Sequence, residues 1–156
     1  MPLSIRYTFS QRFNVSAKKA FNWCTDYDPK DPELMHEEGV ERSVTQITNG
    51  SLILKEVFPL PTGQVEKQKL VKLYPEKLMW VSTHIAGPNK HSQFLYIISP
   101  KGKNSSVLKF IANHLEYKEG MREEEIRSLT SKLCKDDANT WKLLAKAMTE
   151  ELKSSR

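Results

Sequence analysis

The chain has 156 residues, of which 38% are hydrophobic and 28% are charged, a composition typical of one soluble domain with a hydrophobic core. The net charge of +5 does not come from the dense basic run of a nucleic-acid-binding arm, so we expect no nucleic acid partner. No stretch approaches about 18 apolar residues, and the N-terminal segment has no apolar signal-peptide core. We therefore expect a cytoplasmic protein without stable membrane insertion.

The two cysteines and four histidines form no recognisable metal or redox motif. Cys24 and Cys134 are far apart in the chain, and their spacing fits neither zinc binding nor a redox pair, so we expect reduced thiols. None of the histidines forms a helical i, i+4 pair. We predict no metal site and no cofactor.

The first predicted element is a half-buried strand in which apolar and polar residues alternate. Its mainly apolar face is made of Ile5, Tyr7, Phe9 and Phe13, with Gln11 among them. A short helix follows, with Ser16 as its N-cap, because a serine hydroxyl there can accept a hydrogen bond from a free helix N–H. The prolines of "DYDPKDP" end this helix, and a further helical turn is expected at "PELM".

Six strand-like segments follow Gly39, separated by turns rich in Asn, Pro and Gly. The segments are "GVERSVTQITNG", "SLILKEVF", "QVEKQKLVKLY", "LMWVSTHIAG", "HSQFLYIIS" and "SVLKFIANHLEYK". Because the connections are short, neighbouring strands should run antiparallel.

One long amphipathic helix is predicted from about Met121 to Leu152. The residues that share its mainly apolar stripe are Ile126, Thr130, Leu133, Asp137, Trp141, Leu144 and Met148. Charged and small polar residues occupy the opposite side. The predicted sheet is the only partner large enough to cover this stripe.

The order of elements, together with "FNVSAKKAFNWCTDYDP", resembles the START / Bet v 1-like superfamily, also called the polyketide cyclase-like (SRPBCC) superfamily. Ala20-Phe21 and Trp23 stand where that superfamily has a Val-Trp or Ala-Phe pair near the middle of its first helix. The resemblance covers nearly the whole chain and implies one domain over residues 1–156 of the α+β class. Its helix-grip fold has a curved antiparallel seven-stranded sheet, two short helices after the first strand, and a long C-terminal helix across the concave face.

The resemblance also implies a cavity between the sheet and the C-terminal helix that binds a hydrophobic or amphipathic, lipid-like small molecule. Three functions remain open. Non-catalytic binding or transport of such a ligand comes first. The alternatives are an aromatase/cyclase-type enzyme that uses acid–base residues of the cavity, and a chaperone-activator-like protein-interaction module. No feature of the sequence predicts an oligomeric state.

Candidate ligand-binding residues come from the strands and from the long helix. They are Tyr7, Phe9, Trp80, His84, Tyr96, Phe110, His114, Leu133, Asp137, Trp141, Leu144 and Met148. The orientation of the strand around Trp80 is ambiguous, but if Trp80 faces inward, then Ser82 and His84 do too. An outward Lys109 places Phe110 and His114 inside. Each apolar candidate can equally be ordinary core filling.

Asp137 lies at the centre of an otherwise apolar stripe, where an unpaired buried carboxylate is costly. It is either a polar group facing the cavity with a raised pKa, or a surface residue near a helix break at "CKDDAN", where Asp136 or Asp137 caps a second helix. With His84 or His114 it forms the only candidate acid–base set, and we assign no catalytic residue.

The lysines of "VEKQKLVKLYPEK" form a local basic patch, to which Lys101 and Lys103 add. Such a patch can meet a phosphate backbone or an anionic membrane surface. No aromatic residues alternate with these lysines as a stacking platform for bases requires. We therefore expect a solvated strand face whose lysines block edge pairing.

Overall fold

The structure is a computed structural model that describes residues 1–154, so residues 155 and 156 of the predicted domain lie outside the described residues. The elements in chain order are β1 (Leu3–Phe13), α1 (Ala17–Cys24), α2 (Asp31–Leu34), β2 (Glu41–Thr48), β3 (Ser51–Leu60), β4 (Gly63–Tyr74), the 3-10 helix η1 (Pro75–Lys77), β5 (Met79–Ala86), β6 (Gln93–Pro100), β7 (Ser106–Glu116) and α3 (Glu123–Ser154). The predicted order of one strand, two short helices, six strands and one long helix is confirmed.

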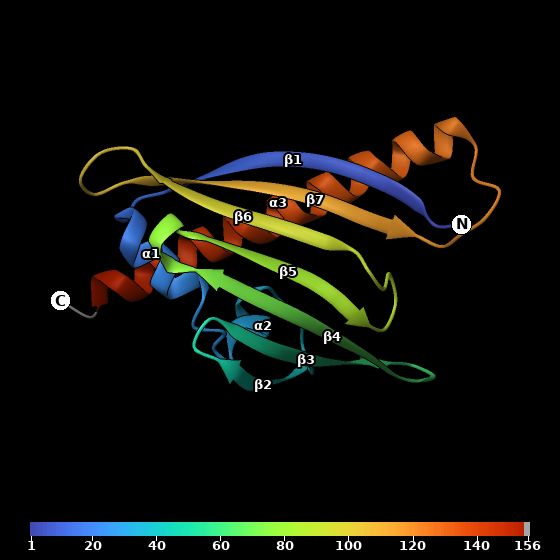
Figure 1. Ribbon diagram of the computed structural model, residues 1–156, viewed down its shortest axis with the longest axis horizontal. Helices are drawn as coiled ribbons and strands as arrows, with labels where there is room; N and C mark the ends of the chain where they lie inside the picture. The colour runs from blue at the N-terminus through green and yellow to red at the C-terminus, as the bar shows by residue number, and fades with distance from the viewer. Residues whose placement is uncertain (155–156) are drawn as a thin grey trace.

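The seven strands form one antiparallel sheet in the order β1-β7-β6-β5-β4-β3-β2. Because β1 and β2 occupy opposite edges, the segment with α1 and α2 carries the chain from one edge of the sheet to the other (Figure 1). All later neighbours are joined by short turns or loops, as the turn signals predict. The alternation of β1 is also confirmed, since Ile5, Tyr7 and Phe13 are buried and the residues between them are mostly exposed.

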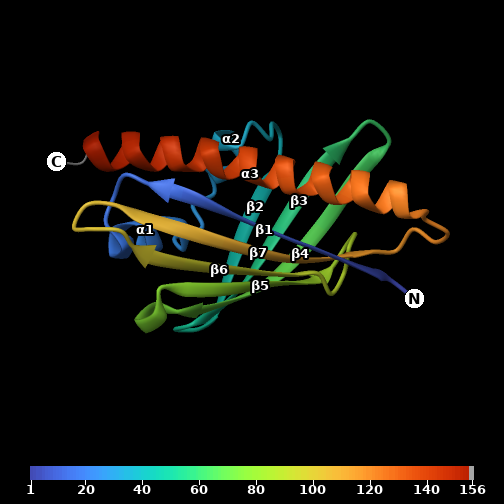
Figure 2. The ribbon, with the colours of Figure 1, turned by 90° about the horizontal axis from the view of Figure 1, so that it is seen from above.

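Helix α3 runs along one face of the sheet, and Figure 2 shows it as a separate layer next to the strands. Its residues Leu144, Ala145 and Met148 are buried. The helix continues without a break through Asp136 and Asp137, so the alternative of a second, newly capped helix is wrong. No helix within the described residues is both long and apolar enough to cross a bilayer.

Helix α1 fills one end of the space between the sheet and α3. Ala20 and Phe21 are buried in the main core, where the Phe21 ring meets Trp80 edge-on at 5.8 Å between centroids. Ser16 is the N-cap residue and has the expected extended backbone, but its hydroxyl makes no capping hydrogen bond. The predicted side-chain cap is therefore wrong, and Ser16 supports the helix through its carbonyl oxygen, which accepts from Ala20 N–H at 2.9 Å.

Candidate functional site

A cavity of about 400 Å³ lies between the inner face of the sheet and the helices. Its lining includes residues from all seven strands, from α1 and α2, and from α3. Three kinds of surface meet in it: an aromatic row across the sheet, a charged network on β2, β3 and β4, and polar groups on β1, β5, β7 and α3.

The aromatic row crosses four adjacent strands. Trp80 on β5 lies opposite Tyr96 on β6, Tyr96 lies opposite Phe110 on β7, and Phe110 lies opposite Phe9 on β1. The Trp80 and Tyr96 rings are stacked with centroids 4.7 Å apart, and Trp141 of α3 lies 5.7 Å from Tyr96. Since side chains opposite one another in an antiparallel sheet are nearest neighbours, this register builds a continuous apolar surface, and its members Trp80, Tyr96 and Phe110 form the floor of the cavity.

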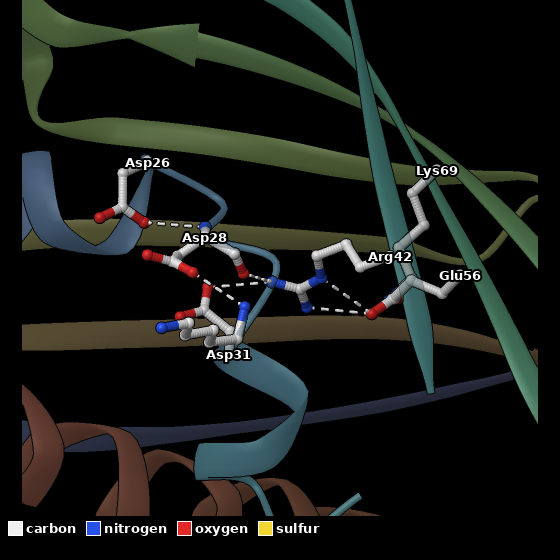
Figure 3. A network of polar contacts seen from close by, with 7 residues as sticks. Asp26, Asp28, Asp31, Arg42, Glu56 and Lys69 are labelled. Atoms are coloured by element: carbon white, nitrogen blue, oxygen red, sulfur yellow. Dashed lines mark hydrogen bonds and ion pairs between the residues drawn. The ribbon is translucent and has the colours of Figure 1, made fainter. Parts of the chain in front are cut away.

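The charged network has Arg42 of β2 at its centre (Figure 3). The Arg42 guanidinium donates to Asp31 at 2.9 Å and to Glu56 at 2.9 and 3.3 Å, and Lys69 donates to the other Glu56 oxygen at 2.8 Å. The Glu56 side chain is only 2% exposed. Burial alone raises the pKa of Glu56, but Lys69 and Arg42 outweigh burial and lower this pKa to about 2. Burial raises the pKa of Asp31 to about 6, although Arg42 opposes the shift.

Two histidines line the cavity on the inner face of β5 and β7. His114 Nε2 lies 3.2 Å from the Asn89 amide nitrogen, and the same amide donates to the carbonyl oxygen of Leu115 at 2.9 Å. His84 differs, because its Nδ1 atom is buried and has no hydrogen-bond partner among the described residues. Burial and the nearby Lys69 and Lys67 charges lower the pKa of His84 to about 4, so the ring is neutral at pH 7.

Asp137 faces the cavity from the middle of α3 and accepts a hydrogen bond from the Tyr7 hydroxyl of β1. Burial raises the pKa of Asp137, and the Tyr7 hydrogen bond opposes the shift. Burial of the Tyr7 hydroxyl and its hydrogen bond to the Asp137 carboxylate raise the pKa of Tyr7. Of the two interpretations of Asp137, the structure thus favours a polar group in the cavity.

All of the predicted site residues line the cavity except Phe9 and Met148. Phe9 stacks on Phe110 at 4.7 Å between centroids, on the edge strand beneath α3, and lies outside the cavity lining. Met148 is completely buried in the core around α1. The inward orientation of Trp80 also places Ser82 and His84 in the cavity, which resolves the ambiguity of β5.

The charged part of the lining was not predicted. The expectation of a solvated face on β4 is wrong for Lys67 and Lys69, which face the cavity, whereas Lys72 is exposed. Alternation in "SLILKEVF" holds the signal for Glu56, since it lies on the same face as the buried Leu52 and Leu54. Arg42 carries no such signal, because the other residues of β2 are mostly exposed on both faces. No cluster of three or more metal-ligating side chains occurs among residues 1–154.

No protein-family model and no curated protein matches the sequence. Solved structures match over nearly the whole chain. The Zhui aromatase/cyclase from Streptomyces sp. R1128 has a TM-score of 0.75 at 9% identity, with 99% of this chain and 97% of that chain covered. Norcoclaurine synthase from Thalictrum flavum, solved with dopamine and hydroxybenzaldehyde, has a TM-score of 0.69 at 14% identity, with 99% and 90% covered.

A START superfamily protein from Mycobacterium smegmatis has a TM-score of 0.66 at 16% identity, with 97% of this chain and 99% of that chain covered. Structural similarity at sequence identities this low shows the fold and leaves the activity open. The agreement extends to the element order, the seven-stranded antiparallel sheet and the long C-terminal helix. The chain has the helix-grip fold of the START / Bet v 1-like (SRPBCC) superfamily.

Proposed function

We propose that the chain binds a hydrophobic or amphipathic small molecule in the cavity between the sheet and α3, without converting it chemically. The observation that carries this proposal is a cavity of about 400 Å³ floored by the aromatic row of Trp80, Tyr96 and Phe110. Its volume lies within the range of roughly 300–1,000 Å³ that is usual for small-molecule sites. Apolar surface removed from water supplies roughly 25 cal/mol per Å², so an apolar ligand gains most over this floor.

Solved structures with the same fold support this proposal. The norcoclaurine synthase structure contains dopamine and hydroxybenzaldehyde, which are small aromatic molecules with polar substituents. The cavity of this chain offers both components that such molecules require. Aromatic rings form its floor, and Asp137, His84 and the Glu56 network provide polar groups at its walls.

A second candidate is acid–base chemistry of the aromatase/cyclase kind. The observation in its favour is that Tyr7, Asp137, His84 and His114 line one cavity. A carboxyl group with a raised pKa and a neutral imidazole are both suited to proton transfer near neutral pH. Mass spectrometry of the ligand that co-purifies with wild type and with Asp137→Asn tests this candidate. Two ligands of different mass would favour an enzyme, and one identical ligand would favour binding alone.

We also infer that residues 1–156 act as one domain in a reducing, cytoplasmic compartment. Support for one domain comes from β1, near the start of the chain, which pairs with β7 and packs beneath α3. Support for the compartment comes from the free thiols of Cys24 and Cys134.

Binding is tested first by native mass spectrometry of the protein purified from cells, where a small-molecule adduct is expected. Titration with the neutral dye N-phenylnaphthylamine is the second test. The dye should bind with one-to-one stoichiometry and quench the emission of Trp141, which lines the cavity. Trp23 and Trp80 also line it, so single-tryptophan variants assign the signal. Absence of both an adduct and saturable dye binding would overturn the proposal.

A further inference from the structure

The Arg42 network balances its own charges. Its two cations, Arg42 and Lys69, are paired with two carboxylates, Asp31 and Glu56. Both Glu56 oxygens are used, one by Lys69 and the other by Arg42. The network is therefore complete without a ligand, as buried charges require.

Lys67 also lines the cavity, but its ammonium group forms no ion pair with the carboxylates of this network. Its Nζ lies 4.8 Å from the centroid of the Phe58 ring, and no described carboxylate lies within ion-pair distance of it. Burial and the neighbouring Lys69 charge both lower the pKa of Lys67. The charges of Glu56 and Glu37 act in the opposite direction on this pKa, but neither carboxylate forms an ion pair with Lys67. A half-buried ammonium in this position favours a negative partner.

His84 supplies an unsatisfied hydrogen-bonding atom on the adjacent strand. It lies opposite Lys69 in the pairing of β4 with β5, and it faces the same cavity as Lys67. The two strands stay close beyond this pair, because a side chain at Gly87 would collide with the Glu66 carbonyl oxygen and press on the Lys67 backbone. The Pro88 backbone accepts a hydrogen bond from the His84 ring, and Nδ1 has no partner, so in the neutral ring the proton is on Nε2 and Nδ1 is an acceptor. The neutral ring therefore adds no second positive charge beside Lys67.

We propose that Lys67 forms an anion-binding subsite at this wall of the cavity, so that the ligand is an amphipathic acid with a carboxylate or similar group. The anionic group contacts the Lys67 ammonium. The apolar body of the acid lies over Trp80, Tyr96 and Phe110. This inference rests on the proposed binding function and narrows it to one chemical class.

The test compares two dyes that share one aromatic skeleton. N-phenylnaphthylamine is neutral, and anilinonaphthalene sulfonate is the same molecule with one sulfonate added. Lys67→Met should weaken binding of the sulfonate dye by about tenfold or more, because a charge-assisted hydrogen bond in a desolvated site is lost. Binding of the neutral dye should change by less than about twofold, since only uncharged contacts hold it.

Two controls isolate the charge and its position. Lys67→Arg keeps the charge and should retain the preference for the sulfonate dye. Lys72→Met removes a lysine from the same strand, but from its exposed face, and should leave both affinities unchanged.

The outcomes separate this inference from the proposed function. If the neutral dye binds and Lys67→Met leaves the affinity for the sulfonate dye unchanged, the anion subsite is refuted and cavity binding stands. If Lys67→Met weakens the binding of both dyes equally, the subsite is refuted too, because the effect is then not specific for the charged dye. If neither dye binds to the wild-type protein, the proposed function itself fails.

Discussion

The Tyr7 hydroxyl, on the first strand, donates a hydrogen bond to the Asp137 carboxylate at the middle of the last helix. The two residues are 130 positions apart in the chain, so this bond links its first and last elements inside the cavity. Burial raises the pKa of Asp137, which means that the folded protein holds its charged form at a cost. The Tyr7 bond offsets part of that cost.

The first prediction separates the charge of Asp137 from its hydrogen bond. Asp137→Asn removes the buried charge and retains an oxygen that accepts from Tyr7, so the free energy of unfolding at pH 7 should stay unchanged or rise. Tyr7→Phe leaves the carboxylate without its donor and should lower this free energy by about 1–3 kcal/mol. Urea denaturation at pH 7 measures both. Equal destabilisation by the two variants would show that Asp137 is held mainly by other contacts.

The second prediction concerns the buried ion-pair network. Arg42→Met leaves Glu56 with Lys69 alone and Asp31 without its guanidinium partner. The expected loss of stability is about 3 kcal/mol, at the lower end for a broken buried ion pair, because Lys69 still compensates Glu56. Chemical denaturation measures the loss.

Lys55→Met is the matched control for this network. It breaks an ion pair with Glu66 that is 3.7 Å long and about half exposed on both sides, with exposed fractions of 47% and 45%. Such surface pairs contribute at most about 1 kcal/mol, so the control should be nearly neutral. A loss as small for Arg42→Met as for Lys55→Met would contradict the account of the network.

The fold could be predicted from the sequence because its signals are local and repeated. Alternation in β1, turn residues between the later strands and a helical stripe of 3.6-residue period each specify one element and its buried face. The aromatic and helical parts of the cavity followed from these faces, as for Trp80 and Trp141. The capping prediction for Ser16 was wrong, because a residue type that is common at the N-cap does not ensure that its hydroxyl accepts a hydrogen bond from a helix N–H.

The charged network of Arg42, Glu56 and Lys69 was not predicted, for a different reason. A lysine on a strand normally faces water, and the ion pair with Glu56 makes the inward position of Lys69 favourable. Glu56 lies on the neighbouring strand, and its second partner, Arg42, lies on the strand beyond it. Pairings between strands are not visible in the local pattern of either segment. The same holds for Phe9, whose position on the apolar face was predicted correctly, although it packs against Phe110 and lies outside the cavity lining.

The third prediction is a pH dependence from His84. Burial, with Lys69 and Lys67, lowers its folded pKa to about 4, against about 6.5 in the unfolded chain. Between these values the unfolded chain binds a proton that the folded protein does not, so stability falls as pH decreases from 6.5 to 4. The expected loss is about 2 kcal/mol after a discount for the part of the ring that solvent reaches.

His84→Leu removes this contribution while every other titrating group remains. The stability of wild type relative to His84→Leu should therefore decline between pH 7 and pH 4, and the decline should be absent above pH 7. Urea denaturation at several pH values gives the difference, and NMR titration of the ring gives the folded pKa directly. A constant difference across this range would mean that His84 is not desolvated as described.

The last prediction concerns the empty volume. Leu144 lines the cavity from α3 and is 8% exposed, one turn from Trp141. Leu144→Trp should fill part of the space and reduce binding of N-phenylnaphthylamine by about tenfold or more. If the added ring occupies volume that is open for a ligand, the loss of stability should stay below the cost of about 1–3 kcal/mol that overpacking a filled core carries.

Lys142→Trp adds the same ring on the exposed side of the same helix and controls for the extra fluorophore. It should leave both dye affinity and stability near those of wild type. The two measurements decide between the open functions. Lost binding with little lost stability means that Leu144 borders space available to a ligand. A large loss of stability, with no dye binding to either wild type or Leu144→Trp, means a filled core, and the protein-interaction module then becomes the leading hypothesis.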